Sequence, residues 1–589
     1  MPDPLPFSSR RSPVLGRRGM VATSQPLAVQ AGLEMLSEGG SAADAAVATA
    51  AALSVTEPTS NCLGGDAFAL YFNAADGVVT ALNGSGRAPS RLTLELLRAQ
   101  GFKDSLPPFH AHTITVPGAC SAWCELLERH GRLDRSVVLE PAIRLAEAGF
   151  PVAPITAHFW ERGVERQLLK SPGGLELTID GRAPHPGEIF RNPGLARTLA
   201  AVARSGRAGF YEGEIAEGIA AAVQNAGGVL SPSDLADHRA TWDAPISTLY
   251  RGIRVWECPP NGQGLAALLA LNILGGFDLA HEAPLGPQRI HWMAEALKLA
   301  FADAAWFIAD PGFSPAPLEQ LLSEEYAAQR RRQVRRSRAA GRVERGLERP
   351  GPDTVYLTVV DGEGNACSFI QSNYMGFGTG IVPHGLGFSL QNRGHNFRLD
   401  PRHPNALAPG KRPYHTIIPA MATRPDGSLL ASFGVMGGFM QPQGHVQVLV
   451  GLLDDGLDPQ AVLDRPRWCL MESEKGWDLA LEKGIPGTTR TRLAGMGHRV
   501  HTITGHERAL FGRGQVIVRD SESGVLWGGS DPRADGLAAA SPSYFFFGES
   551  SSSDFMRFAI NPHRSTAAPA PSPNAPSVPP PGTHWPRNT

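Results

Sequence analysis

The segment 354–361 alternates between two kinds of side chain along its whole length. Valine and leucine fall on one face of an extended chain, and threonine and tyrosine fall on the other. The turn sequence GEGN follows, and ACSFIQS at 366–372 returns as a second strand-like run. This pattern predicts a β-hairpin. If the turn is centred near Glu363, Thr354 lies opposite Ser372.

A helical period runs through much of the first half of the chain. Residues 39–55 are rich in alanine; Ser41 is placed to cap the N-terminus of a helix, and Asp44 favours its positive end. The run FALYF at 68–72 is typical of a strand. The first half is therefore expected to mix helices and strands. Further helical patterns occupy 118–131, 137–148, 194–205 and 288–303.

The length and composition indicate a globular chain with room for a large core. The chain has 589 residues, of which 42% are hydrophobic and 19% charged. Because a single core rarely grows past about 250–300 residues, we expect two lobes or one unusually layered body. The net charge of -2 argues against a nucleic-acid or membrane partner and leaves a small molecule as the expected ligand.

The cysteines and the N-terminal residues bear on the compartment. Six cysteines are few for this length, and none has metal-ligand spacing, which fits a reducing compartment without a metal or other cofactor. The first residues are charged and interrupted by proline, without the apolar core of a secretory signal, and no long apolar run follows. We expect a cytoplasmic protein.

Two changes of composition divide the chain. Residues 327–348 are rich in arginine and are interpreted as a solvated helix or linker rather than a nucleic-acid site. They lead to a Pro-Gly-Pro breaker at 350–352, beyond which strand patterns dominate. After about residue 541 the chain becomes serine- and proline-rich, which predicts disorder. The predicted parts are 1–353, 354–540 and 541–589.

A threonine that opens a strand is ordinarily only a strand former, but here its surroundings form a larger pattern. DTVYLTVVDGEGNA is followed by GFGTGIV, KRP, MGG and SDPR, and it is preceded by GGSAADAAVA and EPTSNCLGGDAFALY. In order and spacing, from about residue 20 to 540, these motifs resemble the gamma-glutamyltransferase (gamma-glutamyltranspeptidase) family. The resemblance implies an α+β Ntn-hydrolase fold, a four-layer αββα sandwich formed by two subunits cleaved from one precursor.

The resemblance also implies a catalytic set. Cleavage falls between Asp353 and Thr354, and Thr354 then supplies its hydroxyl as nucleophile and its freed α-amine as base. Such an amine titrates at about 7.7–8.0, near working pH, so the precursor is expected to be nearly inactive. Gly437 and Gly438 match the glycine pair whose amides form the oxyanion hole. Ser372 stands where the family has a threonine that hydrogen-bonds the nucleophile.

The expected substrate-binding residues depart from the family pattern. Arg393 and Asn396 stand where most members have a glutamine and an aspartate that hold the glutamyl α-amino group. A cation facing that ammonium is repulsive unless it turns away. His415 and Thr416 replace paired serines, and Tyr374 replaces an asparagine. These changes affect specificity more than the reaction itself.

Two further features concern the pocket. Arg87 is the candidate for the arginine that binds the substrate α-carboxylate, although it lies two positions later than in most members. The loop between Phe397 and Lys411 is shorter than in members with a lid, which predicts an open pocket. Together the departures are similar to the cytoplasmic branch of the family, which includes proteins similar to glutaryl-cephalosporin acylases.

We therefore predict a self-processing enzyme that transfers the gamma-glutamyl group of glutathione-like donors to water, amino acids or peptides through a threonyl acyl-enzyme. The alternatives are a glutaryl or other side-chain amide acylase and a non-maturing binding protein of the same fold. A Ser/His/Asp hydrolase is disfavoured because no GxSxG motif is present. A zinc enzyme is disfavoured because the pairs His110/His112 and His498/His501 lack companions at ligand spacing.

Overall fold

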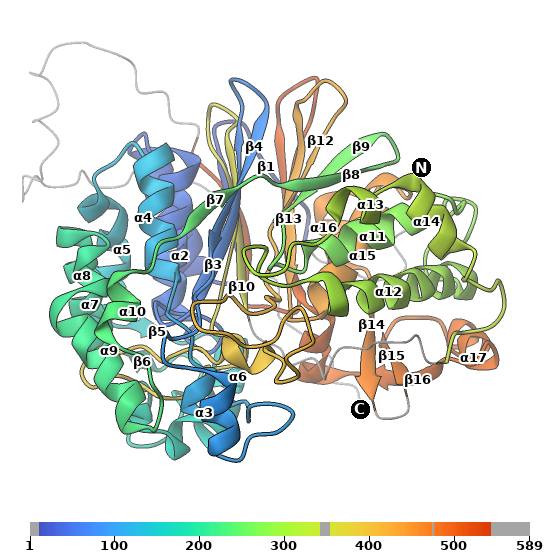
Figure 1. Ribbon diagram of the computed structural model, residues 1–589. Helices are drawn as coiled ribbons and strands as arrows, with labels where there is room; N and C mark the ends of the chain where they lie inside the picture. Colours follow the sequence, from blue (N-terminus) through green and yellow to red (C-terminus); the bar gives the residue numbers. More distant parts are fainter. Residues whose placement is uncertain (1–10, 342–353, 474–475, 543–589) are drawn as a thin grey trace, which may run out of the picture. The chain divides into compact units, whose positions relative to one another are not determined.

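Two seven-stranded sheets stack against each other in this protein (Figure 1). The computed structural model describes residues 11–341, 354–473 and 476–542. The Pro-Gly-Pro breaker, Asp353 and the predicted disordered tail from residue 543 onward lie outside the described residues. Among the residues described, no helix combines the length and apolar character needed to cross a bilayer.

The strands of both sheets come from distant parts of the chain. The first sheet has the order β1 (Val14–Gly16), β18 (Leu526–Ser530), β17 (Arg513–Arg519), β13 (Leu429–Met436), β12 (Ala420–Thr423), β9 (Ile253–Glu257) and β8 (Ile246–Tyr250). The second has the order β19 (Leu537–Ala540), β2 (Met20–Thr23), β10 (Val355–Val360), β11 (Ala366–Ser372), β3 (Asp66–Asn73), β4 (Val78–Gly84) and β7 (Thr241–Asp243).

Helices cover the outer face of each sheet (Figure 1). The second sheet is covered by α1 (Pro26–Ser37), α2 (Ala42–Thr56) and α4 (Ala119–His130); α5 (Arg135–Ala148) packs on α2, and α7 (Pro193–Ser205) packs on α5. The first sheet is covered by α11 (Gly264–Leu274), α12 (Pro287–Phe307), α15 (Met440–Leu453) and α16 (Pro459–Asp464). The order helix, sheet, sheet, helix is the predicted four-layer sandwich, in one layered body rather than two lobes.

Smaller elements complete the described chain. The helices are α3 (Leu94–Ala99), α6 (Pro154–Arg166), α8 (Ala208–Tyr211), α9 (Gly213–Asn225), α10 (Pro232–Ala236), α13 (Leu318–Leu321), α14 (Glu324–Arg331) and α17 (Gly487–Gly495). The strands are β5 (Phe150–Pro151), β6 (Ile189–Phe190), β14 (Trp468–Ser473), β15 (Gly476–Glu482) and β16 (Arg499–Ile503). The last three form a separate sheet.

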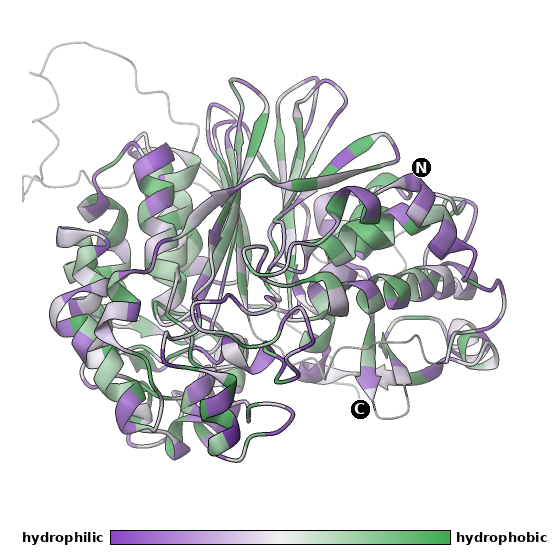
Figure 2. Cartoon of the chain, in the orientation of Figure 1, coloured by the Kyte–Doolittle hydropathy of each residue, from purple (hydrophilic) through white to green (hydrophobic). Residues whose placement is uncertain are grey.

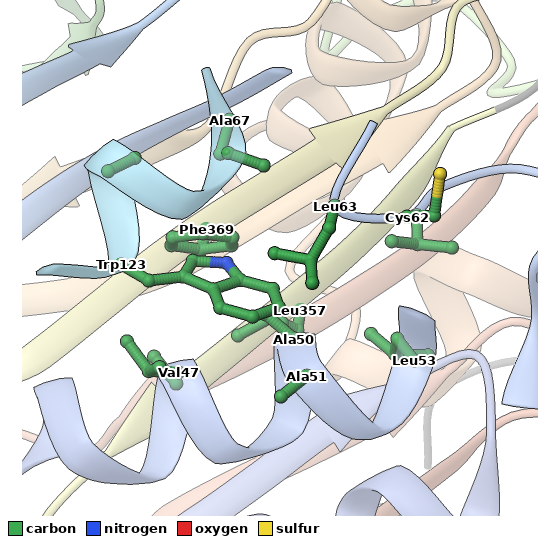
Figure 3. Packing of buried hydrophobic residues seen from close by; sticks show 14 of the residues in the cluster. Val47, Ala50, Ala51, Leu53, Cys62, Leu63, Ala67, Trp123, Leu357 and Phe369 are labelled. Atoms are coloured by element: carbon green, nitrogen blue, oxygen red, sulfur yellow. The ribbon is translucent and has the colours of Figure 1, made fainter. Parts of the chain in front are cut away.

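The alanine-rich helix α2 lies directly against the second sheet. Ser41 caps it, and the Asp44 side chain bonds back to the Ser41 amide, as the sequence predicted for this terminus. Every residue of α2 is buried. Figure 3 shows its Val47 and Ala51 beside Trp123 and Leu357. Small side chains let the helix approach the sheet closely, which gives the dense packing of a protein core.

The predicted hairpin is confirmed in its register. Val355 of β10 pairs with Gln371 of β11, which places Thr354 opposite Ser372. β10 also pairs with β2, so it is an inner strand of its sheet. Its threonine and tyrosine face points to the other sheet, where the Thr358 hydroxyl donates to Ser432 Oγ of β13 at 2.6 Å.

The arginine-rich stretch is more ordered than a solvated linker. Its beginning lies in α14, where Arg330 forms a 2.8 Å ion pair with Asp303 of α12. Arg331 donates to the carbonyls of Asn272 and Ile273 in α11. In Figure 2, α14 is largely hydrophilic, whereas the strands of the central sheets are mostly hydrophobic. Two of the arginines that were expected to face solvent are therefore bound by backbone carbonyls of α11 and by the Asp303 carboxylate of α12.

Candidate active site

Thr354 immediately precedes β10, at the end of the inter-sheet layer where side chains of both sheets meet. Its side chain is buried, and its hydroxyl donates to Ser372 Oγ at 3.2 Å. Ser372 Oγ also accepts the Tyr374 amide at 2.8 Å and Arg393 Nη2 at 3.1 Å. Three donors on one oxygen hold Ser372 in place, so the threonine hydroxyl has a fixed direction. Asp353, the other half of the predicted cleavage site, lies outside the described residues.

The glycine pair lies between the end of β13 and the start of α15. Gly437 has φ 135° and Gly438 has φ 59°, both in the region that favours glycine. A side chain on Gly437 would lie 3.2 Å from the Gly512 Cα. The pair therefore opens the N-terminal end of a 14-residue helix, where backbone amides and the helix dipole favour negative charge.

Two glutamines connect the glycine pair with the threonine. Gln441, in the first turn of α15, donates from Nε2 to Thr354 Oγ1 at 3.5 Å. Gln263 donates to the Gly438 carbonyl at 2.8 Å and also to the Thr416 carbonyl. Sequence reasoning missed both residues. Gln441 lies within the quoted MGG motif region, three residues after Gly438, and this helical spacing is a signal that could have identified it.

Arg393 is the charged group closest to the nucleophile in this network. Its side chain is completely buried, its Nη1 donates to Thr416 Oγ1 at 2.7 Å, and its guanidinium lies 4.3 Å from the centre of the Tyr374 ring. Burial lowers the pKa of Arg393 to about 10, which leaves it charged at neutral pH. The predicted residues Arg393, Thr416, Tyr374 and Ser372 therefore form one contiguous cluster.

Tyr374 and Asn396 extend this cluster. The Tyr374 hydroxyl donates to Asn396 Oδ1 at 2.6 Å, and Asn396 Nδ2 donates to the Tyr414 carbonyl at 3.0 Å. Tyr374 has φ 82°, a strained conformation for a residue with a side chain. Such strain is concentrated at functional sites in proteins.

His415 lies beneath the cluster, in contact with Asp66. His415 Nδ1 accepts the Ile417 amide, so Nε2 carries the proton and donates to Asp66 Oδ2 at 3.0 Å. Burial lowers the pKa of His415 well below its ordinary value, and the ring is neutral. Burial raises the pKa of Asp66 to about 7, against the opposing effect of the nearby Arg393. The structure thus gives His415 a buried partner, and Asp66 joins the site although sequence reasoning had not selected it.

Arg87 has contacts of a different kind. Its guanidinium lies 3.5 Å from the Asp310 carboxylate and donates to the Gly410 carbonyl at 3.2 Å. The Ala88 amide next to it donates to the Lys411 carbonyl, so this loop packs on the KRP segment. These contacts direct Arg87 toward Asp310 and the KRP segment rather than toward the cluster of Ser372 and Arg393.

A small pocket borders the cluster. Tyr374, Asn396 and Tyr414 line it together with Phe439, which follows Gly438. Ala305, Arg398 and His403 are shared with a neighbouring cavity of about 950 Å³ that is lined largely by charged side chains. Phe439 places this pocket next to the glycine pair in the chain, and the larger cavity adjoins it.

Within the described part of the chain, one group of residues away from Thr354 has ligand atoms close enough for a metal ion. His291, Glu295 and His498 have ligand atoms within 4.8 Å of one another, and all three residues are buried. The proton on His498 Nε2 is shared with His291 Nδ1 at 2.8 Å, and Lys298 Nζ lies 2.7 Å from Glu295. The Lys298 ammonium already supplies the positive charge that a metal ion would bring to Glu295. We refer to these four residues as the α12 cluster.

The fold and the site together define the class of protein. Two stacked sheets between helical layers, with a threonine that opens an inner strand, form an N-terminal-nucleophile hydrolase. A family model for gamma-glutamyltranspeptidase matches residues 28–541. The chain belongs to the gamma-glutamyltranspeptidase family.

Similar proteins within this family differ in their activities. A glutathione hydrolase-like YwrD proenzyme of Bacillus subtilis is 39% identical over 89% of this chain and 99% of its own. An oxamate amidohydrolase proenzyme of Klebsiella pneumoniae is 37% identical over 88% and 98%. The crystal structure of a cephalosporin acylase from Bacillus halodurans is 47% identical, with a TM-score of 0.85 over 92% of this chain and 99% of that one.

Proposed function

We propose that this protein is a self-processing amide hydrolase or acyltransferase that acts on the distal amide of a dicarboxylic acid, of which gamma-glutamyl and glutaryl amides are the candidate types. The observation that carries the proposal is the contact between Thr354 Oγ1 and Ser372 beside the Gly437–Gly438 pair. A nucleophile, its orienting hydroxyl and a helix N-terminus that favours an oxyanion are the parts that acyl transfer requires.

Maturation and turnover use the same hydroxyl. In maturation, Thr354 Oγ1 attacks the Asp353 carbonyl carbon; the C–N bond breaks, which frees the α-amine of Thr354, and an ester forms on Oγ1. Water then hydrolyses the ester, which releases the Asp353 carboxylate and restores the Thr354 hydroxyl. In turnover, that amine takes the hydroxyl proton as Oγ1 attacks the substrate amide, and it returns the proton to the departing amine. Water or a second amine then attacks the threonyl ester. The amides of Gly437 and Gly438 stabilise the oxyanion in both reactions.

The buried guanidinium favours one of the two candidate acyl groups. A gamma-glutamyl group carries an ammonium on its α-carbon, and Arg393 stands where an acidic or neutral partner for that ammonium is expected. Two cations in a buried site repel each other strongly, because little water screens them. We therefore favour an acyl group without the ammonium over a gamma-glutamyl group.

Intact-mass spectrometry with N-terminal sequencing tests the proposal first. We expect two chains, the second beginning Thr-Val-Tyr-Leu, and hydrolysis of at least one glutaryl or gamma-glutamyl anilide. A single uncut chain after prolonged incubation would instead support a binding protein that never matures. All six cysteines are unpaired and buried, which favours a cytoplasmic location, and fractionation of the native host checks it.

A further inference from the structure

The Arg393 guanidinium has a feature that its structural contacts leave unexplained. Its Nη1 and Nη2 donate to Thr416 and Ser372, but its Nε has no partner among the described residues. The side chain has no exposed surface. An unsatisfied buried donor on a charged group is costly, and in a native protein it calls for an explanation.

No carboxylate of the described residues forms an ion pair with Arg393. Asp66 is the acidic group that affects its charge most, yet Asp66 directs its own oxygens to His415, Gln391 and two backbone amides. The other contacts of the guanidinium are neutral hydroxyls and the Tyr374 ring. A buried cation without a direct counter-ion is a preformed receptor for an anion.

The position of this receptor relative to the nucleophile limits the ligand. Arg393 and Thr354 are joined through Ser372 Oγ by two hydrogen bonds of 3.1 and 3.2 Å in series. A substrate whose scissile carbonyl lies at Thr354 Oγ1 can therefore reach Arg393 with a carboxylate that is only a few bonds from that carbonyl. A five-carbon glutaryl or gamma-glutamyl chain places its carboxylate farther away than a two- to four-carbon chain does.

We propose that Arg393 binds the free carboxylate of the acyl group, and that the preferred substrates are monoamides of short dicarboxylic acids with two to four carbons. The proposal rests on the proposed function, because it places the acyl group on Thr354. Arg393 is thereby a specificity-determining residue, and the open Nε is the donor that the substrate carboxylate completes.

A substrate series on the wild-type enzyme tests the proposal without any mutation. The oxalyl, malonyl, succinyl and glutaryl monoanilides are compared with the methyl esters of the same four acids. We expect kcat/KM to be about 100-fold higher for the best free acid than for its ester, because the ester leaves the buried guanidinium unpaired. Equal rates for acid and ester, or a maximum at glutaryl, would overturn the proposal.

The variant Arg393→Gln tests whether Arg393 is the residue that binds the substrate carboxylate. In Arg393→Gln we expect both substrates to react more slowly, because Arg393 also donates to Ser372, but the acid is expected to lose about 100-fold more in kcat/KM than the neutral ester, so the preference disappears. Arg144→Gln, on a surface arginine of α5 paired with Glu34, is the matched control and is expected to keep the preference. If both substrates lose equally in Arg393→Gln, the residue is structural and the proposal is wrong.

A binding measurement distinguishes a failure of this proposal from a failure of the proposed function. Titration calorimetry with succinate needs neither maturation nor turnover. We expect succinate to bind the wild-type protein and to bind Arg393→Gln at least tenfold more weakly. A chain that never splits but shows this difference would refute the proposed enzyme and support the anion site. A chain that splits and hydrolyses amides without Arg393-dependent succinate binding would do the opposite.

Discussion

Two buried polar clusters in this protein differ in how completely their donors are used. In the α12 cluster, both Glu295 oxygens have partners, Lys298 and the Ala340 amide, and the His291 ring bonds to His498 and the Arg335 carbonyl. At Thr354, the fully buried Arg393 has one donor without a partner among the described residues. A closed network of this kind holds chain segments together, whereas an open one beside a nucleophile is a site for a ligand. The α12 cluster fixes residues 335–340 on α12.

Loss of the Thr354 hydroxyl is expected to have the largest effect on maturation and turnover. Thr354→Ala removes the hydroxyl, so we expect a folded single chain without maturation or turnover, checked by intact mass and by amide hydrolysis. Thr358→Ser is the matched control, because it lies on the same strand and keeps the hydroxyl that donates to Ser432. The control is expected to split normally. A Thr354→Ala chain that still splits would assign the nucleophile elsewhere.

The glycine pair is expected to have the next largest effect. Gly437 has φ 135°, a backbone conformation that is strained for alanine, and the new side chain would crowd Gly512. Gly437→Ala must therefore shift the amides of the pair, and we expect kcat to fall about 10² to 10³-fold with little change in KM. Gly456→Ala also has a positive φ, 63°, but meets no neighbour, and it controls for backbone strain. A similar fall in both variants would argue against an oxyanion hole.

The nucleophile hairpin could be predicted from the sequence because it depends on a local pattern, whereas the order of the layers was implied by the resemblance to the family. Alternation and the GEGN turn determined the pairing of Thr354 with Ser372, and a cap residue marked the start of α2. Asp66 and Gln263 were missed because they reach the site through the fold rather than through spacing: Asp66 opens β3, and Gln263 precedes α11. For the same reason His498 lacked companions in the sequence, since His291 and Glu295 come from a helix about 200 residues earlier.

Stability, rather than activity, is expected to respond in the α12 cluster. Glu295→Gln removes the counter-ion of the buried Lys298, and we expect the free energy of unfolding to fall by about 3–5 kcal/mol. The double variant Glu295→Met/Lys298→Met removes both charges and should recover most of that loss. Urea unfolding of the two variants measures the difference. The kcat of folded Glu295→Gln is expected to stay unchanged, and a selective loss of kcat would assign a functional role to this cluster.

The smallest expected effect is a pH dependence of stability that originates from Asp66. Its pKa is raised by burial to about 7 in the folded protein, against about 3.9 in an unfolded chain. Between these values the folded state binds one more proton than the unfolded state, so the Asp66 contribution to stability falls as pH rises from about 4 to about 7 and is constant above. The pKa of His415 is lowered on folding, so His415 changes stability with pH in the opposite direction. Because His415 is present in both the wild type and Asp66→Asn, its contribution in the unfolded state is the same in both and cancels in the comparison. We therefore expect the Tm of the wild type, relative to Asp66→Asn, to decline across this range. A difference that rises with pH would mean that the carboxylate form is stabilised, and Arg393 would then have a stronger counter-ion than its hydrogen bonds indicate.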